Sequence, residues 1–397
     1  MNPFQPRTME GALRDLVQKY PVVTVTGPRQ SGKTVLCRMV FPEKPYFNLE
    51  NPDTRKFAQE DPRGFLNELP DGAVLDEIQR TPDLLSYIQP MIDEDPWPGR
   101  FVLTGSQQFQ VREALSQSLA GRTGLLTLLP FDCREVAAYL DLRNVDRVLL
   151  HGFYPRLHHM GIHPAQALAD YFETYVQRDV RLLLQVRQAS VFEKFVRLCA
   201  GRIGQLLNLQ GLANETGISH TTAREWISIL EASYILFQLP PWHANVSKRL
   251  IKTPKIYFWD VGLAAYLLGL TEEKQVSRDP LRGSLFENMV IAEIFKQHYH
   301  RGIRPRLCFF RDRTGNEVDL VVEQGRELAL VEIKSGRTVT DAFFRGLKRI
   351  SRIAGDRIRG GGVLYGGTEA QTRSDWTVWP IQDLGNLHAS IQTFFAD

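Results

Sequence analysis

The sequence GPRQSGKT at residues 27–34, preceded by the apolar stretch Val22–Thr26, decides the fold of the first part of the chain. It fits the pattern G-x-x-x-x-G-K-[ST], and the residues that follow, Lys33–Val40, have helical periodicity. The glycines let backbone N–H groups curl around phosphate oxygens, and the N-terminal end of a helix attracts anions. The sequence therefore predicts a phosphate-binding loop formed by Gly27, Pro28, Arg29, Gln30, Ser31, Gly32, Lys33, Thr34 and Val35.

Two side chains of this loop have predicted roles in the binding and turnover of ATP. We expect Lys33 to reach the β- and γ-phosphates and the hydroxyl of Thr34 to join the shell of a Mg²⁺ ion. The alternative is a surface glycine turn with a solvated lysine, which does not explain why the motif stands between an apolar strand and a helix. We therefore expect ATP and Mg²⁺ as cofactors.

An acidic pair follows a second apolar stretch, Ala73–Leu75. Asp76 has the place of a carboxylate that holds Mg²⁺, and Glu77 that of a base that activates the attacking water. Acidic pairs after strands are common, so this signal gains its weight from its position downstream of the phosphate-binding loop.

A third apolar stretch, Phe101–Thr104, runs into Gly105, Ser106 and Gln107. Because ligands bind beyond the carboxyl ends of parallel strands, Ser106 is a candidate for orienting the attacking water. The alternative is that Ser106 only caps the next helix.

Arg122 precedes a further apolar stretch, Leu125–Leu129. An arginine here would stabilise charge on the γ-phosphate, either within its own subunit or as a finger into a neighbour in a homo-oligomer. The pair Arg178-Asp179 offers the same two interpretations. A purely structural ion pair is the alternative for both arginines.

The first third of the chain alternates short apolar runs with helical patterns, which is typical of an α/β fold with a parallel sheet covered by helices on both faces. The expected strands are Val22–Thr26, Phe47–Glu50, Ala73–Asp76, Phe101–Thr104 and Leu125–Leu129. Helices are expected near Lys33–Val40, Leu84–Glu94 and Val111–Ala120.

The middle of the chain has mainly helical periodicity and includes a helix-turn-helix pattern. Gly217 stands at the turn, Ser219 precedes the second helix, and His220–Leu230 would face DNA with Thr221, Thr222 and Arg224. A lid or a protein contact is the alternative. Downstream, a basic run offers contacts to a phosphate backbone or forms a solvated strand: Lys248, Arg249, Lys252 and Lys255.

The C-terminal part combines carboxylates and a lysine in a pattern suited to a metal. Asp319 lies in the expected strand Glu317–Glu323, and Glu332 and Lys334 share one face of the next strand because side chains alternate. Asp319 and Glu332 would hold a divalent metal, with Lys334 beside it and Glu287 contributed by the helix Ser284–Tyr299. The alternative is an amphipathic hairpin with exposed charges.

Length and composition fit a multidomain globular protein. The chain has 397 residues, 43% of them hydrophobic, and its formal charge of +3 is too small to indicate a nucleic-acid partner. Four scattered cysteines without a C-x-x-C pair argue against a disulfide framework. Without an apolar segment near Met1–Arg14 or a membrane-spanning stretch, we expect a soluble, cytoplasmic protein with no membrane contact. The expected domains are residues 1–135, 136–240 and 241–397.

These motifs together resemble the AAA-type P-loop ATPases of bacteria and archaea that carry a C-terminal domain of unknown function. The resemblance rests on Gly27–Thr34, Leu75–Glu77, Leu103–Ser106 and Leu119–Arg122, and it covers nearly the whole chain. The stretches Tyr175–Val180 and Lys248–Tyr257 also look like family signatures. The resemblance implies an AAA/RecA-like parallel sheet, a helical, winged-helix-like segment and a restriction-endonuclease-like α/β domain.

The resemblance also implies two functions for the C-terminal part. Asp319, Glu332 and Lys334 match the PD-(D/E)xK pattern of such nuclease-like domains, although no proline directly precedes Asp319. One interpretation is an ATPase coupled to a domain directed to DNA or another nucleic acid, with or without nuclease activity. The other is an ATP-switched platform for protein interactions, built on an inactive nuclease fold.

Overall fold

The computed structural model describes residues 5–106, 118–180, 189–242, 253–312, 314–373 and 375–396, without the side chains of residues 177–179. Several predictions therefore fall outside the described part. They concern the side chains of Arg178 and Asp179, Gln107, most of the helix expected at Val111–Ala120, and the basic residues Lys248, Arg249 and Lys252. The chain divides into two compact units. The first unit comprises Met1–Phe131, Ala232–Tyr234 and Tyr299–Ile303, and the second comprises the remaining residues.

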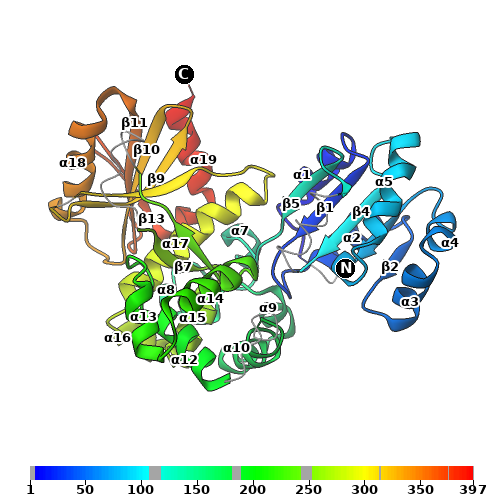
Figure 1. Ribbon diagram of the computed structural model, residues 1–397. Coiled ribbons are helices and arrows are strands. Elements are labelled where there is room, and N and C mark those ends of the chain that lie inside the picture. Colours follow the sequence, from blue (N-terminus) through cyan, green and yellow to red (C-terminus); the bar gives the residue numbers. More distant parts are fainter. Residues whose placement is uncertain are drawn as a thin grey trace. The chain divides into compact units, whose positions relative to one another are not determined.

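The first unit contains a sheet of five parallel strands in the order β2-β3-β4-β1-β5 (Figure 1). The predicted parallel α/β fold is confirmed. The strands are β1 (Val22–Thr26), β2 (Tyr46–Asn48), β3 (Ala73–Asp76), β4 (Phe101–Gly105) and β5 (Thr123–Thr127). All residues of β1, β3 and β4 are buried, which explains why these strands read as unbroken apolar runs.

Helices cover both faces of this sheet because successive side chains of a strand point to opposite faces. In β1, Val23 and Val25 pack with Leu13 and Leu36 on one face. On the other face, Phe101 and Leu103 of β4 join the core formed with the helices that follow β2 and β3. The helical elements are α1 (Glu10–Val17), α2 (Lys33–Val40), α3 (Pro52–Glu60), α4 (Pro62–Asn67), η1 (Ile78–Arg80) and α5 (Leu84–Glu94).

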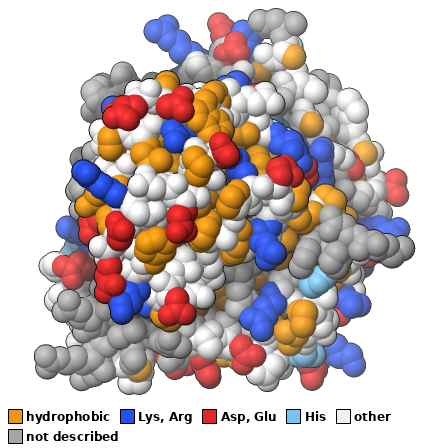
Figure 2. Space-filling model, turned by 90° about the vertical axis from the view of Figure 1, so that its right-hand side faces the viewer, with side chains coloured by type: hydrophobic (Ala, Val, Ile, Leu, Met, Phe, Trp, Pro, Cys, Tyr) orange, Lys and Arg blue, Asp and Glu red, His pale blue; other side chains and the backbone are white. Residues whose placement is uncertain are grey.

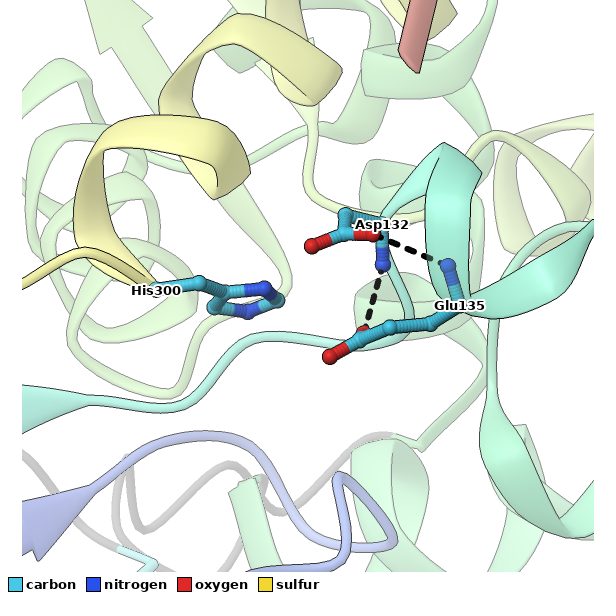
Figure 3. Close-up of side chains that lie close together, drawn as sticks. All are labelled: Asp132, Glu135 and His300. Carbon is cyan, nitrogen blue, oxygen red and sulfur yellow. Dashed lines mark hydrogen bonds between the residues drawn. The ribbon is translucent and has the colours of Figure 1, made fainter. Parts of the chain in front are cut away.

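The second unit begins with a short helix, α7 (Cys133–Val136), fixed by a capping box. The carboxylate of Asp132 accepts hydrogen bonds from the backbone N–H groups of Arg134 and Glu135. The Glu135 carboxylate accepts one from the Asp132 N–H, and Figure 3 shows the two reciprocal bonds between Asp132 and Glu135. The next helical elements are α8 (Val145–His151), α9 (Pro155–Met160), α10 (Pro164–Tyr171), η2 (Phe172–Val180), α12 (Ala189–Ala200), α13 (Leu209–Thr216), α14 (His220–Ala232), α15 (Val261–Leu267) and α16 (Glu273–Arg278).

The helix-turn-helix pattern corresponds to α13 and α14. Gly217 turns the chain with a φ of 74°, and Ser219 accepts a hydrogen bond from the Thr222 N–H at the start of α14. After α14, β6 (Leu236–Leu239) pairs with β7 (Lys255–Phe258) in an antiparallel ribbon. Lys255 is only 2% exposed here, so it is not the solvent-facing phosphate contact that the basic run predicted.

The C-terminal part of the second unit is a mixed sheet in the order β12-β13-β11-β10-β9-β8. Its strands are β8 (Leu307–Arg311), β9 (Glu317–Gln324), β10 (Glu327–Lys334), β11 (Ile358–Tyr365), β12 (Gln371–Thr372) and β13 (Thr377–Pro380). Its helical elements are α17 (Arg282–Tyr299), η3 (Asp341–Phe344), α18 (Arg345–Ala354), η4 (Gly355–Arg357), η5 (Ile381–Asn386), α19 (Leu387–Gln392) and η6 (Thr393–Phe395).

The long helix α17 joins the helical and sheet-forming parts of the second unit. Asn288 exchanges two hydrogen bonds with the backbone of Phe258 in β7, at 2.6 and 2.9 Å. One turn later on α17, Glu293 accepts a hydrogen bond from the Cys133 N–H of α7 at 3.0 Å. Among the residues that the structure describes, no helix has the length and apolar character needed to cross a membrane.

Candidate functional site

The loop between β1 and α2 has a backbone that two glycines make possible. Gly27 has a φ of 148° and Gly32 a φ of 91°, which other residues rarely adopt. A side chain at Gly27 would also collide with the backbone, because a Cβ atom there would lie 2.0 Å from the Leu128 carbonyl oxygen. The guanidinium of Arg7 donates to the Ser31 carbonyl and, at 2.8 Å, to the Leu129 carbonyl, so a residue that the motif does not include braces the loop.

Lys33 lies inside this loop. Its Nζ atom donates hydrogen bonds of 3.0 and 2.8 Å to the carbonyl oxygens of Gly27 and Pro28, and the residue is 5% exposed. Burial lowers the pKa of Lys33, and the nearby charges of Glu77 and Asp76 act in the opposite direction. The ammonium group is thus held where the loop would surround a phosphate.

Three hydroxyl groups converge on the carboxylate of Asp76 at the end of β3. The Thr34 Oγ1 and Tyr46 Oη atoms lie 2.9 and 2.6 Å from Asp76 Oδ2, and Thr104 donates to Oδ1. Thr34 and Asp76 therefore supply adjacent oxygen ligands, the type that Mg²⁺ prefers. From the sequence, no roles were predicted for Tyr46 and Thr104. For Thr104 a signal existed, because it is a polar residue near the end of the buried strand β4.

Glu77 follows directly in a left-handed conformation with a φ of 59°, which is uncommon for residues other than glycine. Its N–H donates to Thr104 Oγ1 at 3.1 Å, and its carboxylate accepts hydrogen bonds from Ser106 Oγ, at 2.9 Å, and from Gln79 Nε2. Burial raises the pKa of Glu77, but the charge of Lys33 and the hydrogen bonds from Gln79 and Ser106 outweigh burial, so the net pKa lies below the usual value.

Ser106 directly follows β4, and its hydroxyl donates to the carboxylate of Glu77. Its role in orienting water stays a prediction. Gln79 also reaches Ser106 Oγ, at 3.2 Å from Nε2, so these three side chains form one network. Gln79 was not predicted, because nothing in the sequence distinguishes it from an ordinary polar residue after a strand.

Arg122 lies at the end of the sheet opposite to residues 27–34, which disfavours one of its three interpretations, a role within its own subunit. In the parallel register of β1 and β5, Thr123 is the partner of Val22, and Thr127 is the partner of Thr26 next to the loop. Arg122 is therefore separated from the end of β1 that leads into residues 27–34 by the length of five strand residues, which is about 16 Å. Its guanidinium forms a bidentate ion pair with Asp93 of α5, with contacts of 2.5 and 3.0 Å.

The predicted C-terminal residues come together in the second unit. Lys334 Nζ lies 2.6 Å from Glu332 Oε1 and 3.4 Å from Asp319 Oδ2. Asp319 also accepts a hydrogen bond of 2.7 Å from the Ile333 N–H. Because Asp319 and Glu332 are 6% and 7% exposed, the alternative of a hairpin with exposed charges is wrong.

Glu287 of α17 lies in the same cluster and is bound by residues that the sequence did not indicate. Lys255 Nζ and the Tyr257 hydroxyl, both from β7, lie 3.0 and 2.5 Å from Glu287 Oε1. Lys255 also forms an ion pair with Glu317. We call these residues the carboxylate–lysine cluster: Lys255, Tyr257, Glu287, Glu317, Asp319, Glu332 and Lys334.

The carboxylates of the carboxylate–lysine cluster lie close enough together for the charge of one to raise the pKa of another. Burial and then the Asp319 charge raise the pKa of Glu332 to about 8, while Lys334 acts in the opposite direction. The same two causes raise the pKa of Glu287. Glu332 Oε2 is buried and has no hydrogen-bond partner among the described residues. Asp319 and Glu332 thus offer oxygen ligands for a cation, provided that the Lys334 ammonium moves aside.

Comparisons with known proteins divide the chain into three regions. The family model of an AAA domain matches residues 19–137. Two domains of unknown function, DUF8612 and DUF4143, match residues 142–274 and 282–384. Neither description identifies the C-terminal region as restriction-endonuclease-like or the middle region as a winged helix.

Among solved structures, the Walker-type ATPase PABY2304 of Pyrococcus abyssi is 17% identical, with a TM-score of 0.43, over 65% of this chain and 94% of that chain. AMPPCP-bound DnaA from Aquifex aeolicus is 15% identical, with a TM-score of 0.28, over 56% of this chain and 85% of that one.

Two mycobacterial proteins match most of the chain. The uncharacterized protein Rv2008c of Mycobacterium tuberculosis is 32% identical over 351 residues, which is 87% of this chain and 77% of the relative. The uncharacterized protein Mb2031c of Mycobacterium bovis has the same identity and coverage. The chain therefore belongs to the family of these mycobacterial proteins, and its N-terminal domain is an AAA domain of the P-loop ATPase type.

Proposed function

We propose that the first unit binds ATP with Mg²⁺ and hydrolyses it at the carboxyl edge of β1, β3 and β4. The observation that carries this proposal is the convergence of Lys33, Thr34, Asp76 and Glu77 at that one edge. Backbone N–H groups of residues 27–34 would bind the phosphates, and Lys33 would exchange its carbonyl partners for phosphate oxygens.

The residues that bind the metal differ from the residue that acts as the base. Thr34 and Asp76 would hold Mg²⁺, which when bound supplies positive charge next to the β- and γ-phosphates. Glu77 takes a proton from water as the water oxygen attacks the γ-phosphorus and the bond to the bridging oxygen of ADP breaks. The lowered pKa of Glu77 keeps this base ionised at neutral pH.

The test is a Mg²⁺ titration of ATP hydrolysis by the wild type and by Asp76→Asn. The variant keeps the size of the side chain but lacks its charge and one of its two acceptor oxygens. We therefore expect half-maximal activity at a Mg²⁺ concentration at least tenfold higher. An unchanged Mg²⁺ dependence would remove Asp76 from the metal site.

Gln79 is a second residue that we assign to the attacking water. Its Nε2 atom faces a carboxylate and a hydroxyl oxygen, which fixes the orientation of the amide, and its Oε1 atom is buried without a partner among the described residues. A water molecule has two hydrogens. One goes to the base Glu77, and Gln79 Oε1 accepts the other, so the water oxygen lone pair points away from both residues.

The truncation Gln79→Ala tests this assignment. It should bind ATP as the wild type does, while the turnover number falls by about ten- to a hundredfold. Because Gln79 also lowers the pKa of Glu77, the pH profile of Gln79→Ala should shift upward. Wild-type turnover in Gln79→Ala would contradict the assignment.

A second candidate function concerns the carboxylate–lysine cluster, where Asp319 and Glu332 would hold a divalent metal for cleavage of phosphodiesters. The observation that favours it is the convergence of four predicted residues, with Glu332 Oε2 left unpartnered. The metal would neutralise charge on the phosphate, and Lys334, displaced from Glu332, would face the same phosphate.

The test is to incubate single- and double-stranded DNA and RNA with the protein and Mg²⁺ or Mn²⁺, with and without ATP. Cleavage that disappears in Asp319→Ala supports the second candidate function, and a dependence on ATP would show coupling to the first unit. Cleavage that persists in Asp319→Ala would come from another site or from a contaminating nuclease. Absence of cleavage and of metal binding in the wild type would leave the ATP-switched interaction platform.

A further inference from the structure

Helix α18 (Arg345–Ala354) carries a concentrated positive charge on one face. Its four cations are Arg345, Lys348, Arg349 and Arg352, and the helix contains no acidic residue. Their spacing of i, i+3, i+4 and i+7 places them on one side of an α-helix. All four are exposed, and we call them the basic face of α18.

The opposite side of α18 is committed to the protein core. Leu347 and Ile350 are fully buried and pack with Val318 and Leu330 of the sheet. At Gly346 the helix approaches β9 so closely that a Cβ atom would lie 2.0 Å from the Glu317 carbonyl oxygen. Ile353 is the one large apolar side chain of α18 that is exposed, which is too little apolar surface for insertion into a lipid bilayer.

Three of the four cations of the basic face have no ion-pair partner among the described residues. Arg349 reaches Asp312 at 3.3 Å, but Arg345, Lys348 and Arg352 form no ion pair with a described residue. Like charges three and four residues apart destabilise a helix, so this arrangement has a cost that a bound polyanion would remove. Arg373 extends the positive charge at the start of the helix, because its guanidinium lies 5.6 Å from the ring of Phe344.

This concentration is local. The whole chain has a formal charge of only +3. On the face drawn in Figure 2, acidic and basic side chains are interspersed. The positive electrostatic potential at α18 therefore does not follow from the average composition of the protein.

We propose that the basic face of α18 binds the sugar–phosphate backbone of duplex DNA. The cations from Arg345 to Arg352 span about 10 Å along the helix axis, enough to contact two or three phosphates of one strand. The basic face contains no aromatic residue on which an unpaired base could stack, so a duplex fits it better than a single strand.

The start of α18 packs beside Glu317, whose carboxylate pairs with Lys255 in the carboxylate–lysine cluster. This contact uses the buried side of α18, so the basic face on the other side stays open to a duplex. The proposal goes beyond ATP hydrolysis, and it holds whether or not the cluster cleaves DNA.

The experiment measures binding of the full-length protein to a fluorescent 20-base-pair DNA duplex by anisotropy, in EDTA so that no cleavage occurs. The variant is the triple substitution Arg345→Gln, Lys348→Gln and Arg352→Gln. The matched control, Lys56→Gln, Arg63→Gln and Lys274→Gln, removes the same charge from exposed positions elsewhere. Titrations at 50, 100 and 200 mM salt give the salt dependence.

The triple variant should bind at least tenfold more weakly than the wild type at 100 mM salt. The slope of log K against log salt should become less negative by about 2 to 3, since three phosphate contacts are lost. The control should keep the affinity and slope of the wild type. Equal midpoints of thermal unfolding for all three proteins will show that each is folded. Because the binding assay contains no ATP, its result is separate from that of the proposed ATPase function.

Three results would overturn the proposal. The first is a triple variant that binds DNA with the affinity and slope of the wild type. The second is a wild type that binds no DNA at 50 mM salt. The third is displacement of the duplex by polyglutamate as effectively as by unlabelled DNA, which would assign the basic face to an acidic protein partner.

Discussion

At the scale of single residues, Lys33 provides the most direct test of nucleotide binding. Its buried ammonium group has only carbonyl dipoles as hydrogen-bond partners in the loop, at 2.8 and 3.0 Å, and burial lowers its pKa. Phosphate oxygens are better partners for a buried cation, since they carry full charge. Lys33→Ala should therefore weaken ATP binding by at least a hundredfold in calorimetry.

The control is Lys19→Ala, which removes an exposed lysine paired with Asp15. It should bind ATP as the wild type does. An ATP affinity of Lys33→Ala equal to that of the control would show that Lys33 does not contact the phosphates.

At the scale of elements, Glu293 on α17 makes stability depend on pH. It is fully buried, and Gln297 Nε2 and the Cys133 N–H donate to its Oε1 atom at 2.6 and 3.0 Å. Burial, and then the negative charge of Asp132, raise the pKa of Glu293 to about 8. A raised pKa means that the folded state favours the protonated carboxyl, so stability is lost as the pH rises toward that value.

Glu293→Gln should therefore be more stable than the wild type at pH 8.5 by an amount on the order of a few kcal/mol, and this difference should shrink toward pH 5. Thermal unfolding at several pH values measures it. The exposed substitution Glu225→Gln on α14 should show no such trend. A difference between Glu293→Gln and the wild type that is constant with pH would mean that Glu293 is ionised in the folded protein throughout.

The strands of the first unit were predictable from sequence because their signal is local. β1, β3 and β4 are buried, mainly apolar runs, and each was expected within one residue of its bounds. β1 is followed by Gly27, β3 ends in Asp76 and β4 ends in Gly105. The strands β2 and β5 were expected one to two residues further along the chain than they lie. β11 was not expected, because Gly360–Gly362 weaken a strand pattern. The structure shows why glycine stands there. A Cβ atom at Gly362 would lie 1.9 Å from the Thr377 carbonyl oxygen of the neighbouring strand.

The candidate sites were predictable where spacing alone brings residues together. Glu332 and Lys334 share a strand face, and Asp319 is across the β9–β10 hairpin, so their contact follows from period two. Lys255 and Tyr257 reach Glu287 because β7 packs near α17, a long-range arrangement that no local pattern encodes. The same holds for Tyr46 and Thr104, which meet Asp76 only after strands far apart in sequence have paired.

At the scale of the whole molecule, Arg122 decides whether hydrolysis depends on assembly. Its distance from the loop of its own subunit leaves a role as a finger into a neighbouring copy, or a structural pair with Asp93. If Arg122 acts as a finger, a subunit of Arg122→Ala keeps Glu77 in its own site but offers no arginine to its neighbour. A subunit of Glu77→Gln lacks the base but still offers its arginine to the neighbouring site. Mixing the two should restore activity above the sum of the separate proteins.

Asp93→Ala separates the alternatives, since it breaks the ion pair but keeps the arginine. A structural role predicts that Asp93→Ala and Arg122→Ala have the same lowered stability and unchanged turnover. A strictly additive mixture together with wild-type turnover of Arg122→Ala would exclude the finger.

The most direct test of ATP hydrolysis at this site is a parallel measurement of ATP binding and ATP hydrolysis in Glu77→Gln. The substitution preserves the size of the side chain and its contacts with Gln79 and Ser106, but it removes the base. We predict an ATP affinity within about threefold of the wild type and a turnover number at least a hundredfold lower. Turnover by Glu77→Gln at the wild-type rate would contradict this prediction.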